Sequence, residues 1–193
     1  MTRPHYRFAH AHAGVNPARQ TGISTLLVIV VLAVGALLLI GGSNVTKYIE
    51  GQKANNDMAE LNEIRASLID YANKHNTTFT GFTLAIGCRQ QVFSENRCSG
   101  DGAGLAVSNG WGGAYTFTIT NVSSGVNNGL SLSSSLVPDA VCIKQISYQW
   151  DQWARIMVGN TTVKANIVQP IDDTAINSAC VGGANTIVWT VKA

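Results

Sequence analysis

The sequence contains one long apolar stretch, TGISTLLVIVVLAVGALLLIGG, at residues Thr21 to Gly42. Its central part, Ile23 to Ile40, holds 18 residues without a charge, close to the roughly 20 that cross a bilayer as a helix. The stretch begins well inside the chain rather than near Met1. Three roles are therefore open: a cleaved secretion signal, a permanent anchor, or the first part of a helix that continues into a soluble domain.

The charges around this stretch are distributed asymmetrically. Arg3, Arg7 and Arg19 precede it, whereas the first acidic residue of the chain is Glu50. This positive-inside arrangement predicts that residues 1 to 21 stay in the cytoplasm and that the rest is exported. The net charge is only +2 over 193 residues, with 12% charged residues, so nothing in the composition indicates binding to nucleic acid.

The flanks of the stretch distinguish the three roles. The region before it is long and polar, and the following GGSNVTKYIEGQ offers no Ala-x-Ala site, so an ordinary cleaved signal peptide is disfavoured. The residues from Val45 to His75 contain no proline and predict a continuing helix. A loosening of that helix is expected at Gly41-Gly42-Ser43 and at Gly51.

The continuation has the pattern of an amphipathic helix, with apolar residues at steps of three and four. One face carries Met58, Leu61, Ile64, Leu68, Tyr71 and Ala72. We expect the opposite, solvated face to hold most of Glu50, Asp57, Glu60, Glu63, Arg65 and Asp70. The sequence thus predicts one helix over 23–75, apolar in its first half and packed on a soluble domain in its second.

The remaining residues predict a sheet domain. Residues 76–113 read as an irregular loop region, and AYTFTITNV from Ala114 to Val122 alternates apolar and polar residues with the period of a strand. Further strands are expected in WARIMVG, VKANIVQ and TIVWTVK, with a hairpin turn at Gly159-Asn160-Thr161. Between them, VPDAVCIKQISYQW predicts a short helix that begins near Pro138 and Asp139. The predicted fold class is α+β, with a long N-terminal helix followed by a domain of strands.

All four cysteines lie on the side of the chain predicted to be exported. They are Cys88, Cys98, Cys142 and Cys180, separated by 9, 43 and 37 residues. These spacings match no Cys-x-x-Cys zinc or redox motif, and an oxidising compartment favours disulfides. Spacing alone leaves three ways of pairing them.

This layout resembles the type IV pilins, and among them the type IVb and conjugative thin-pilus subunits. Two further motifs carry the resemblance: NGWGG at Asn109 to Gly113, similar to the entry of the first head strand, and SACVGGANTIVWTV, similar to the C-terminal disulfide region. The resemblance implies the pairs Cys88–Cys98 and Cys142–Cys180. It also implies a cytoplasmic leader over 1–22, a long helix over 23–75 and a head over 76–193. In that head a disulfide-stapled antiparallel sheet would pack on the second half of the helix.

The resemblance implies a processing route and a function as well. A prepilin peptidase would cut between Gly22 and Ile23 and methylate the new amino terminus. The precursor would sit in the inner membrane with the pilus assembly machinery. The mature subunit would then join other pilin subunits, through its apolar helix, into an extracellular filament for adhesion, aggregation or conjugative mating contact.

One residue of the family pattern is missing. These subunits usually carry a glutamate shortly after the cut, where this sequence has Leu27 and Val28. The absence keeps two alternatives open: a minor or tip pilin, and a monomeric single-pass protein that presents an adhesive or receptor head. An unpaired charge is costly in apolar surroundings, so the missing acid bears on how subunits find their register.

No residue cluster in the sequence predicts an enzyme, a metal or a cofactor. Three of the four histidines, His5, His10 and His12, fall in the predicted leader. His75 has no defined serine or cysteine partner, and the pair Asp172-Asp173 and the segment Gly100 to Gly104 read as solvated loop. Tyr148, Trp150 and Trp153 form an aromatic group for which packing is favoured over a carbohydrate or receptor contact.

Overall fold

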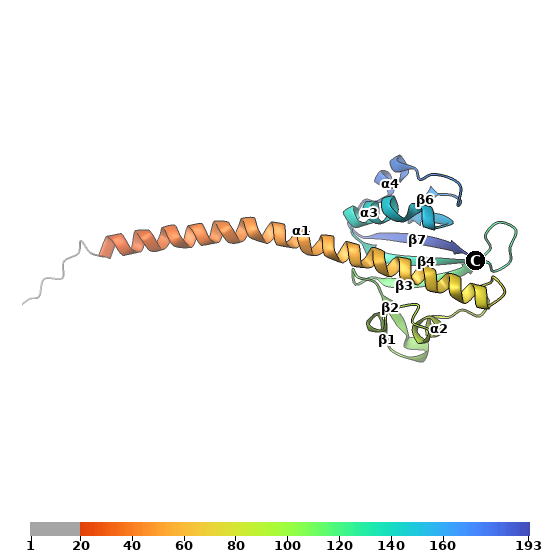
Figure 1. The fold of residues 1–193 in the computed structure, drawn as a ribbon. Coiled ribbons are helices and arrows are strands. Elements are labelled where there is room, and N and C mark those ends of the chain that lie inside the picture. Colours follow the sequence, from red (N-terminus) through yellow and green to blue (C-terminus); the bar gives the residue numbers. More distant parts are fainter. Residues whose placement is uncertain (1–19) are drawn as a thin grey trace, which may run out of the picture. The chain divides into compact units, whose positions relative to one another are not determined.

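The computed structural model describes residues 20–193 (Figure 1), with side chains described at residues 28, 29 and 31 and from residue 48 onward. The predicted leader before Gln20 lies outside these residues. Contacts divide the chain into two compact units, Met1–Tyr48 and Ile49–Ala193. The second unit holds the sheet and the hydrophobic core.

The helix α1 spans Gln20–Lys74, 55 residues without a break. It ends because Asn76 and Thr77 take left-handed backbone angles, with φ of 56° and 58°, while the N–H groups of His75 and Thr77 both donate to the carbonyl of Ala72 at 2.9 Å. Gly41, Gly42, Ser43 and Gly51 are all helical, so the expected loosening there does not interrupt α1. Among the described residues, no helix combines the length and the apolar character needed to cross a membrane.

The predicted buried stripe of α1 is confirmed from Leu61 onward. Leu61, Ile64, Leu68 and Ala72 are fully buried and Tyr71 is 4% exposed, whereas Met58 is only half-buried. The prediction for the polar face was wrong at two positions, because Asp57 and Glu60 are 1% and 8% exposed. The periodicity could not reveal this, since it locates apolar residues and says nothing about polar partners on other elements.

Seven strands form one sheet in the order β1-β2-β3-β4-β7-β5-β6, and every neighbouring pair is antiparallel. The strands are β1 Cys98–Ser99, β2 Ala106–Ser108, β3 Ala114–Thr120, β4 Gly129–Val137, β5 Arg155–Val158, β6 Thr161–Lys164 and β7 Asn185–Lys192. The predicted class, a long N-terminal helix on a disulfide-stapled antiparallel sheet, is confirmed.

The helices of the second unit lie on one face of this sheet and beside its two ends. The C-terminal part of α1 runs across that face, α2 Leu84–Arg89 lies beside β1 and β2, and α3 Asp139–Gln149 and α4 Asp173–Ala179 lie at the opposite end of the strand order, near β7 and β6 (Figure 1). Alternate strand residues such as Tyr115, Leu132 and Trp189 are buried with the α1 stripe in one core. The other face of the strands carries mostly hydroxyl side chains.

Several elements differ from the prediction, and α4 was not predicted. β4, which lies between β3 and β7, was missed, although GLSLSSSLV alternates leucine and serine, because its serines have low strand propensity. The strand predicted in VKANIVQ ends at Lys164. Residues 76–113, expected to be irregular, contain α2, β1 and β2 and two 3-10 turns, Glu95–Arg97 and Gly102–Gly104. The hairpin turn at Gly159 and Asn160 and the helix α3 are where the sequence predicted them.

Candidate functional site

Two disulfides close the two sides of the head. Cys88 on α2 pairs with Cys98 on β1, with Cα atoms 6.2 Å apart. Cys142 on α3 pairs with Cys180, the residue that follows α4, with Cα atoms 5.8 Å apart. These are the pairs that the resemblance implied. The first holds the segment after α1 against the sheet edge, and the second joins the two helices on the opposite side.

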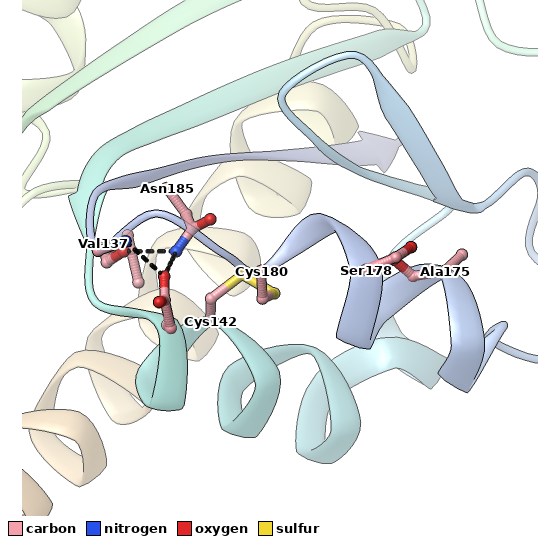
Figure 2. Close-up of a disulfide and its surroundings, with 8 residues drawn as sticks. Val137, Cys142, Ala175, Ser178, Cys180 and Asn185 are labelled. Carbon is pink, nitrogen blue, oxygen red and sulfur yellow. Dashed lines mark hydrogen bonds between the residues drawn. A yellow bond between two sulfur atoms is a disulfide. The ribbon is translucent and has the colours of Figure 1, made fainter.

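The second disulfide has a polar brace beside it (Figure 2). One carboxylate oxygen of Asp139, at the first turn of α3, accepts hydrogen bonds from the Gly183 N–H at 2.9 Å and from Asn185 Nδ2 at 2.7 Å. Asn185 Nδ2 also donates to the carbonyl of Val137 at 3.1 Å. The brace fixes the turn before β7 on the start of α3, so the C-terminal region is held by covalent and polar contacts together.

The buried carboxylate of Asp57 connects α1 to three other segments of the head. Oδ2 of Asp57 accepts a hydrogen bond from Trp111 Nε1 at 3.1 Å and another from Gln145 Nε2 on α3. Its other oxygen, Oδ1, accepts from the N–H of Gly110 and the hydroxyl of Tyr115, each at 3.4 Å. One side chain of α1 thus binds donors from the turn before β3, from β3 and from α3.

This arrangement changes the pKa of Tyr115. Burial raises the pKa of its phenol well above the ordinary value, and the negative charges of Asp57 and then Glu60 raise it further. A neutral phenol is the form that can donate to the carboxylate of Asp57. The surroundings of Tyr115 therefore favour its protonated form.

The second buried acid of α1 forms an ion pair. Both oxygens of Glu60 accept from Nε of Arg97 at 3.1 Å, and Oε2 accepts from Nη2 at 2.8 Å. Burial alone would lower the pKa of Arg97, but its hydrogen bond to Glu60 and the charge of Glu60 leave it raised. Because Arg97 precedes Cys98, this pair and the first disulfide hold the same segment of the head.

The NGWGG motif forms a tight turn under Asp57. The Asn109 side chain accepts from the N–H groups of Trp111 and Gly113 at 2.9 and 2.8 Å, and its Nδ2 donates to Ser134 Oγ at 2.9 Å. A Cβ on Gly113 would lie 2.0 Å from the carbonyl oxygen of Ser135. The motif therefore needs its last glycine, Gly113, for backbone contact with β4, and its tryptophan reaches the carboxylate on α1.

The predicted aromatic group divides between core and surface. Trp153 is fully buried against Trp189, with ring centroids 5.4 Å apart, while Tyr148 is 72% exposed. Trp150 lies 5.1 Å beneath the ammonium of Lys164, a buried lysine that donates to the carbonyls of Trp150 and Trp153 at 2.6 and 2.7 Å. Burial lowers the pKa of Lys164, and the charge of Asp151 opposes that shift.

The other residues weighed for chemistry are placed as follows. His75 stacks on Tyr71 with ring centroids 4.2 Å apart, and Asp172 caps α4 by accepting from the Ala175 N–H at 3.0 Å. Among the described residues, no group of three His, Cys, Asp or Glu side chains is placed to hold a metal ion. His5, His10 and His12 lie outside the described residues.

The expected processing site lies at the beginning of α1. Gly22 and Ile23 are in its first turn, and their side chains, like that of Leu27, are outside the described part. The described side chains nearby are apolar and open to solvent: Val28, Ile29 and Val31 are 54%, 61% and 60% exposed. Adjacent exposed apolar residues of this kind indicate a surface that meets another protein or lipid.

The comparisons with known proteins point in one direction. A family model described as PilS N terminal matches residues 51–192. The fold is similar to the crystal structure of a type IV b pilin from Salmonella typhi, with a TM-score of 0.55 and 16% identity over 70% of this chain and 97% of that one. It is also similar to TcpA, a type IV pilin from Vibrio cholerae El Tor biotype, with a TM-score of 0.53 and 12% identity over 73% and 99% of the two chains. No curated protein matches the chain.

Proposed function

The chain belongs to the PilS family of type IV pilins, and we propose on this premise that it polymerises through the first half of α1 into an extracellular filament. The observation that carries the proposal is the exposed apolar surface at Val28, Ile29 and Val31, on a helix whose other end is fixed in the head by Asp57 and Glu60. In a filament, copies of the same helix would cover that surface. The protein is then a structural subunit rather than an enzyme.

The proposal includes a membrane stage. The uncharged residues from Ile23 to Ile40 follow three arginines, which supports an inner-membrane precursor with its leader in the cytoplasm. A prepilin peptidase would cut between Gly22 and Ile23 and methylate the amino group of Ile23. The assembly machinery would then transfer the helix from lipid to the filament, where neighbouring helices replace lipid as the apolar surroundings.

The missing acid modifies how subunits would register. With Leu27 and Val28 at the position of the family's glutamate, no side-chain carboxylate there can pair with a neighbour's terminal ammonium. Registration would then depend on apolar packing of α1 and on contacts between heads. We propose that such filaments act in adhesion, aggregation or conjugative mating contact.

The test is to shear filaments from cells and sequence the amino terminus of the sheared protein. We expect N-methylated Ile23 as the first residue, and we expect Gly22→Val to leave the uncut chain in the membrane fraction. Gly14→Val, a matched change within the leader, should still give sheared protein.

Two results would contradict this proposal. A terminus near Ser43 would remove the apolar helix. An uncut protein found only in membranes would favour the monomeric anchored head, and incorporation at a few copies per filament would identify a minor or tip pilin.

A further inference from the structure

Figure 1 shows that α1 crosses one face of the sheet. The other face carries a cleft near the C-terminal end of β7. Its volume is about 260 Å³, and its floor is formed by the ends of β3, β4, β7 and β5. Its two walls are the loop after β3, residues 121–123, and the loop after β6, residues 165–167. The volume is below the roughly 300 Å³ at which pockets for drug-sized ligands begin, which suits a ligand of about one ring.

The cleft carries positive charge only. Its lining includes Arg155 and Lys192 and no aspartate or glutamate. Arg155 lies opposite Thr190 in the β5–β7 register, and Lys192 follows two residues later on the same face of β7. Since residues i and i+2 of a strand lie roughly 7 Å apart, both long side chains can reach one anionic group above Thr190.

Neither cation is committed to a strong internal contact in the described part of the chain. The one hydrogen bond of the Arg155 guanidinium is a long one, from Nη2 to Thr162 Oγ1 at 3.4 Å, and both Arg155 and Lys192 are exposed. Charge-assisted hydrogen bonds to a carboxylate are among the strongest that a side chain makes. Two cations placed this way therefore favour an acidic ligand over a neutral one.

The floor provides neutral hydrogen-bonding groups beside the cations. Ser131 Oγ and Thr190 Oγ1 are 2.9 Å apart and bond to each other, and whichever hydroxyl donates, the proton of the other remains for a ligand. Further neutral polar side chains in the lining are Thr120, Asn121, Ser123 and Asn166. Val122 and Ile167 add small apolar surfaces at the walls.

We propose that this cleft binds an acidic saccharide, with the carboxylate of one sugar ring between Arg155 and Lys192 and the ring hydroxyls on Ser131, Thr190 and the wall amides. A peptide fits less well, because β4, β7 and β5 each already have two strand neighbours and leave no free edge for strand addition. This site goes beyond the proposed polymerisation and does not depend on it.

The binding test uses the full chain in detergent micelles at 0.15 M salt, with trigalacturonate as the acidic probe, maltotriose as the neutral one and N-acetylglucosamine 6-sulfate, which has a sulfate but no carboxylate, to separate the two anionic groups. By calorimetry we expect trigalacturonate to bind at least about tenfold more tightly than maltotriose. Arg155→Gln and Lys192→Gln should each weaken it about tenfold, and Ser131→Ala about fivefold. Arg89→Gln, an exposed arginine on α2, is the charge-matched control and should bind like the parent.

Several outcomes would overturn the site. Equal binding of acidic and neutral sugars, or an equal loss in Arg89→Gln, would show that no specific site exists. If inorganic sulfate competes as well as trigalacturonate at equal concentration, the cleft is a simple anion site and not a saccharide site. If an acidic peptide or anionic lipid vesicles bind more tightly than trigalacturonate, the proposed ligand is wrong. The double variant Arg155→Gln/Lys192→Gln should still form sheared filaments, so failure of binding and failure of polymerisation are distinguishable.

Discussion

At the scale of single residues, the decisive feature is the carboxylate of Asp57, which is buried although the amphipathic pattern of α1 predicts that it is solvated. Asp57 is 1% exposed and accepts hydrogen bonds from four donors on three segments. A buried carboxylate is tolerable only when its lone pairs are satisfied. Asp57 therefore fixes the orientation of α1 on the head as well as contributing to stability.

Replacing Asp57 tests that role. Asp57→Ala leaves the buried donors of Trp111, Tyr115 and Gln145 unsatisfied, and we expect it to lower the free energy of unfolding by about 3 kcal/mol. Asp70→Ala is the control, because Asp70 forms an exposed pair with Lys74 one turn away, and such pairs contribute only about 0.3 to 0.5 kcal/mol. Urea denaturation of the two variants checks this, and equal losses would contradict the role of Asp57.

Tyr115 gives the site a pH dependence with a defined sign. Burial, and then the charge of Asp57, raise its pKa well above the ordinary value, so the folded chain keeps the phenol proton at pH values where the unfolded chain has lost it. The stability from this group is complete below about pH 10 and falls as pH rises above it, by up to about 1.4 kcal/mol per pH unit.

The corresponding variant is Tyr115→Phe. We expect it to be less stable than the parent at pH 8, because the hydrogen bond to Asp57 is lost, but to lose less stability between pH 10 and 11. Unfolding free energies measured across that range check the slope, with Tyr148→Phe, which removes an exposed phenol, as the control. Parallel slopes for the parent and Tyr115→Phe would show that the buried phenol does not control alkaline unfolding.

Two glycines are expected to respond oppositely to alanine. Gly113→Ala would place a methyl group 2.0 Å from the Ser135 carbonyl oxygen, so β3 and β4 would have to separate and we expect no folded head. Gly51 lies within α1 with nothing within 4 Å of the added atom, so Gly51→Ala should stabilise the chain by about 0.5 to 1 kcal/mol. Thermal unfolding followed by circular dichroism measures both, and a folded Gly113→Ala would contradict the close contact.

At the scale of elements, the sequence predicted best the helices and turns that have a clear signal in neighbouring residues. The buried stripe of α1, the start of α3 and the two-residue turn at Gly159 and Asn160 each follow from periodicity or from start and turn signals. β4 and α4 were missed because serine-rich alternation and a seven-residue helix give weak local signals. The buried Asp57 and Glu60 were missed because their partners are 37 to 88 residues away in the sequence.

The two disulfides should differ in how much they stabilise the head and in how readily they are reduced. Their sequence separations are 10 and 38, so the chain-entropy model gives losses of about 3 and about 4 kcal/mol for the double serine variants at Cys88/Cys98 and Cys142/Cys180. Cys142 and Cys180 are 0% and 2% exposed, whereas Cys88 and Cys98 are half-buried.

Under native conditions we therefore expect dithiothreitol to open Cys88–Cys98 first. Timed alkylation followed by mass spectrometry gives the order, with the fully denatured chain as the control in which burial no longer protects either bond. Earlier reduction of Cys142–Cys180 would show that local opening around α4, rather than static burial, determines access.

At the scale of the whole molecule, the head depends on the second half of α1 as part of its core. The contacts place one compact unit at Ile49–Ala193, and the family model begins at residue 51. The buried apolar residues among the described side chains begin at Ala54. A head without this helix would expose the sheet face that the helix covers.

Two fragments test this dependence. We expect 49–193 to fold with both disulfides and a melting temperature within a few degrees of the full chain in detergent. The fragment 76–193 lacks Leu61, Ile64 and Leu68. Each buried side chain of this size contributes about 1.5 to 3 kcal/mol. The loss of all three is therefore comparable to the whole free energy of folding of a typical domain, and we expect this fragment not to fold. Near-ultraviolet circular dichroism distinguishes the two fragments, and a cooperatively folded 76–193 would contradict the shared core.

The sequence by itself determined the fold class and the helix face that is buried, because hydropathy and periodicity are properties of neighbouring residues. The tertiary structure alone decided which polar residues act together: Asp57 with Trp111, Tyr115 and Gln145, and Arg155 with Lys192 above a hydroxyl floor. Hydrogen bonds and charge pairs are short-ranged and depend on side chains meeting in space. Strand order and register bring those residues together, and no local pattern in the chain encodes that order.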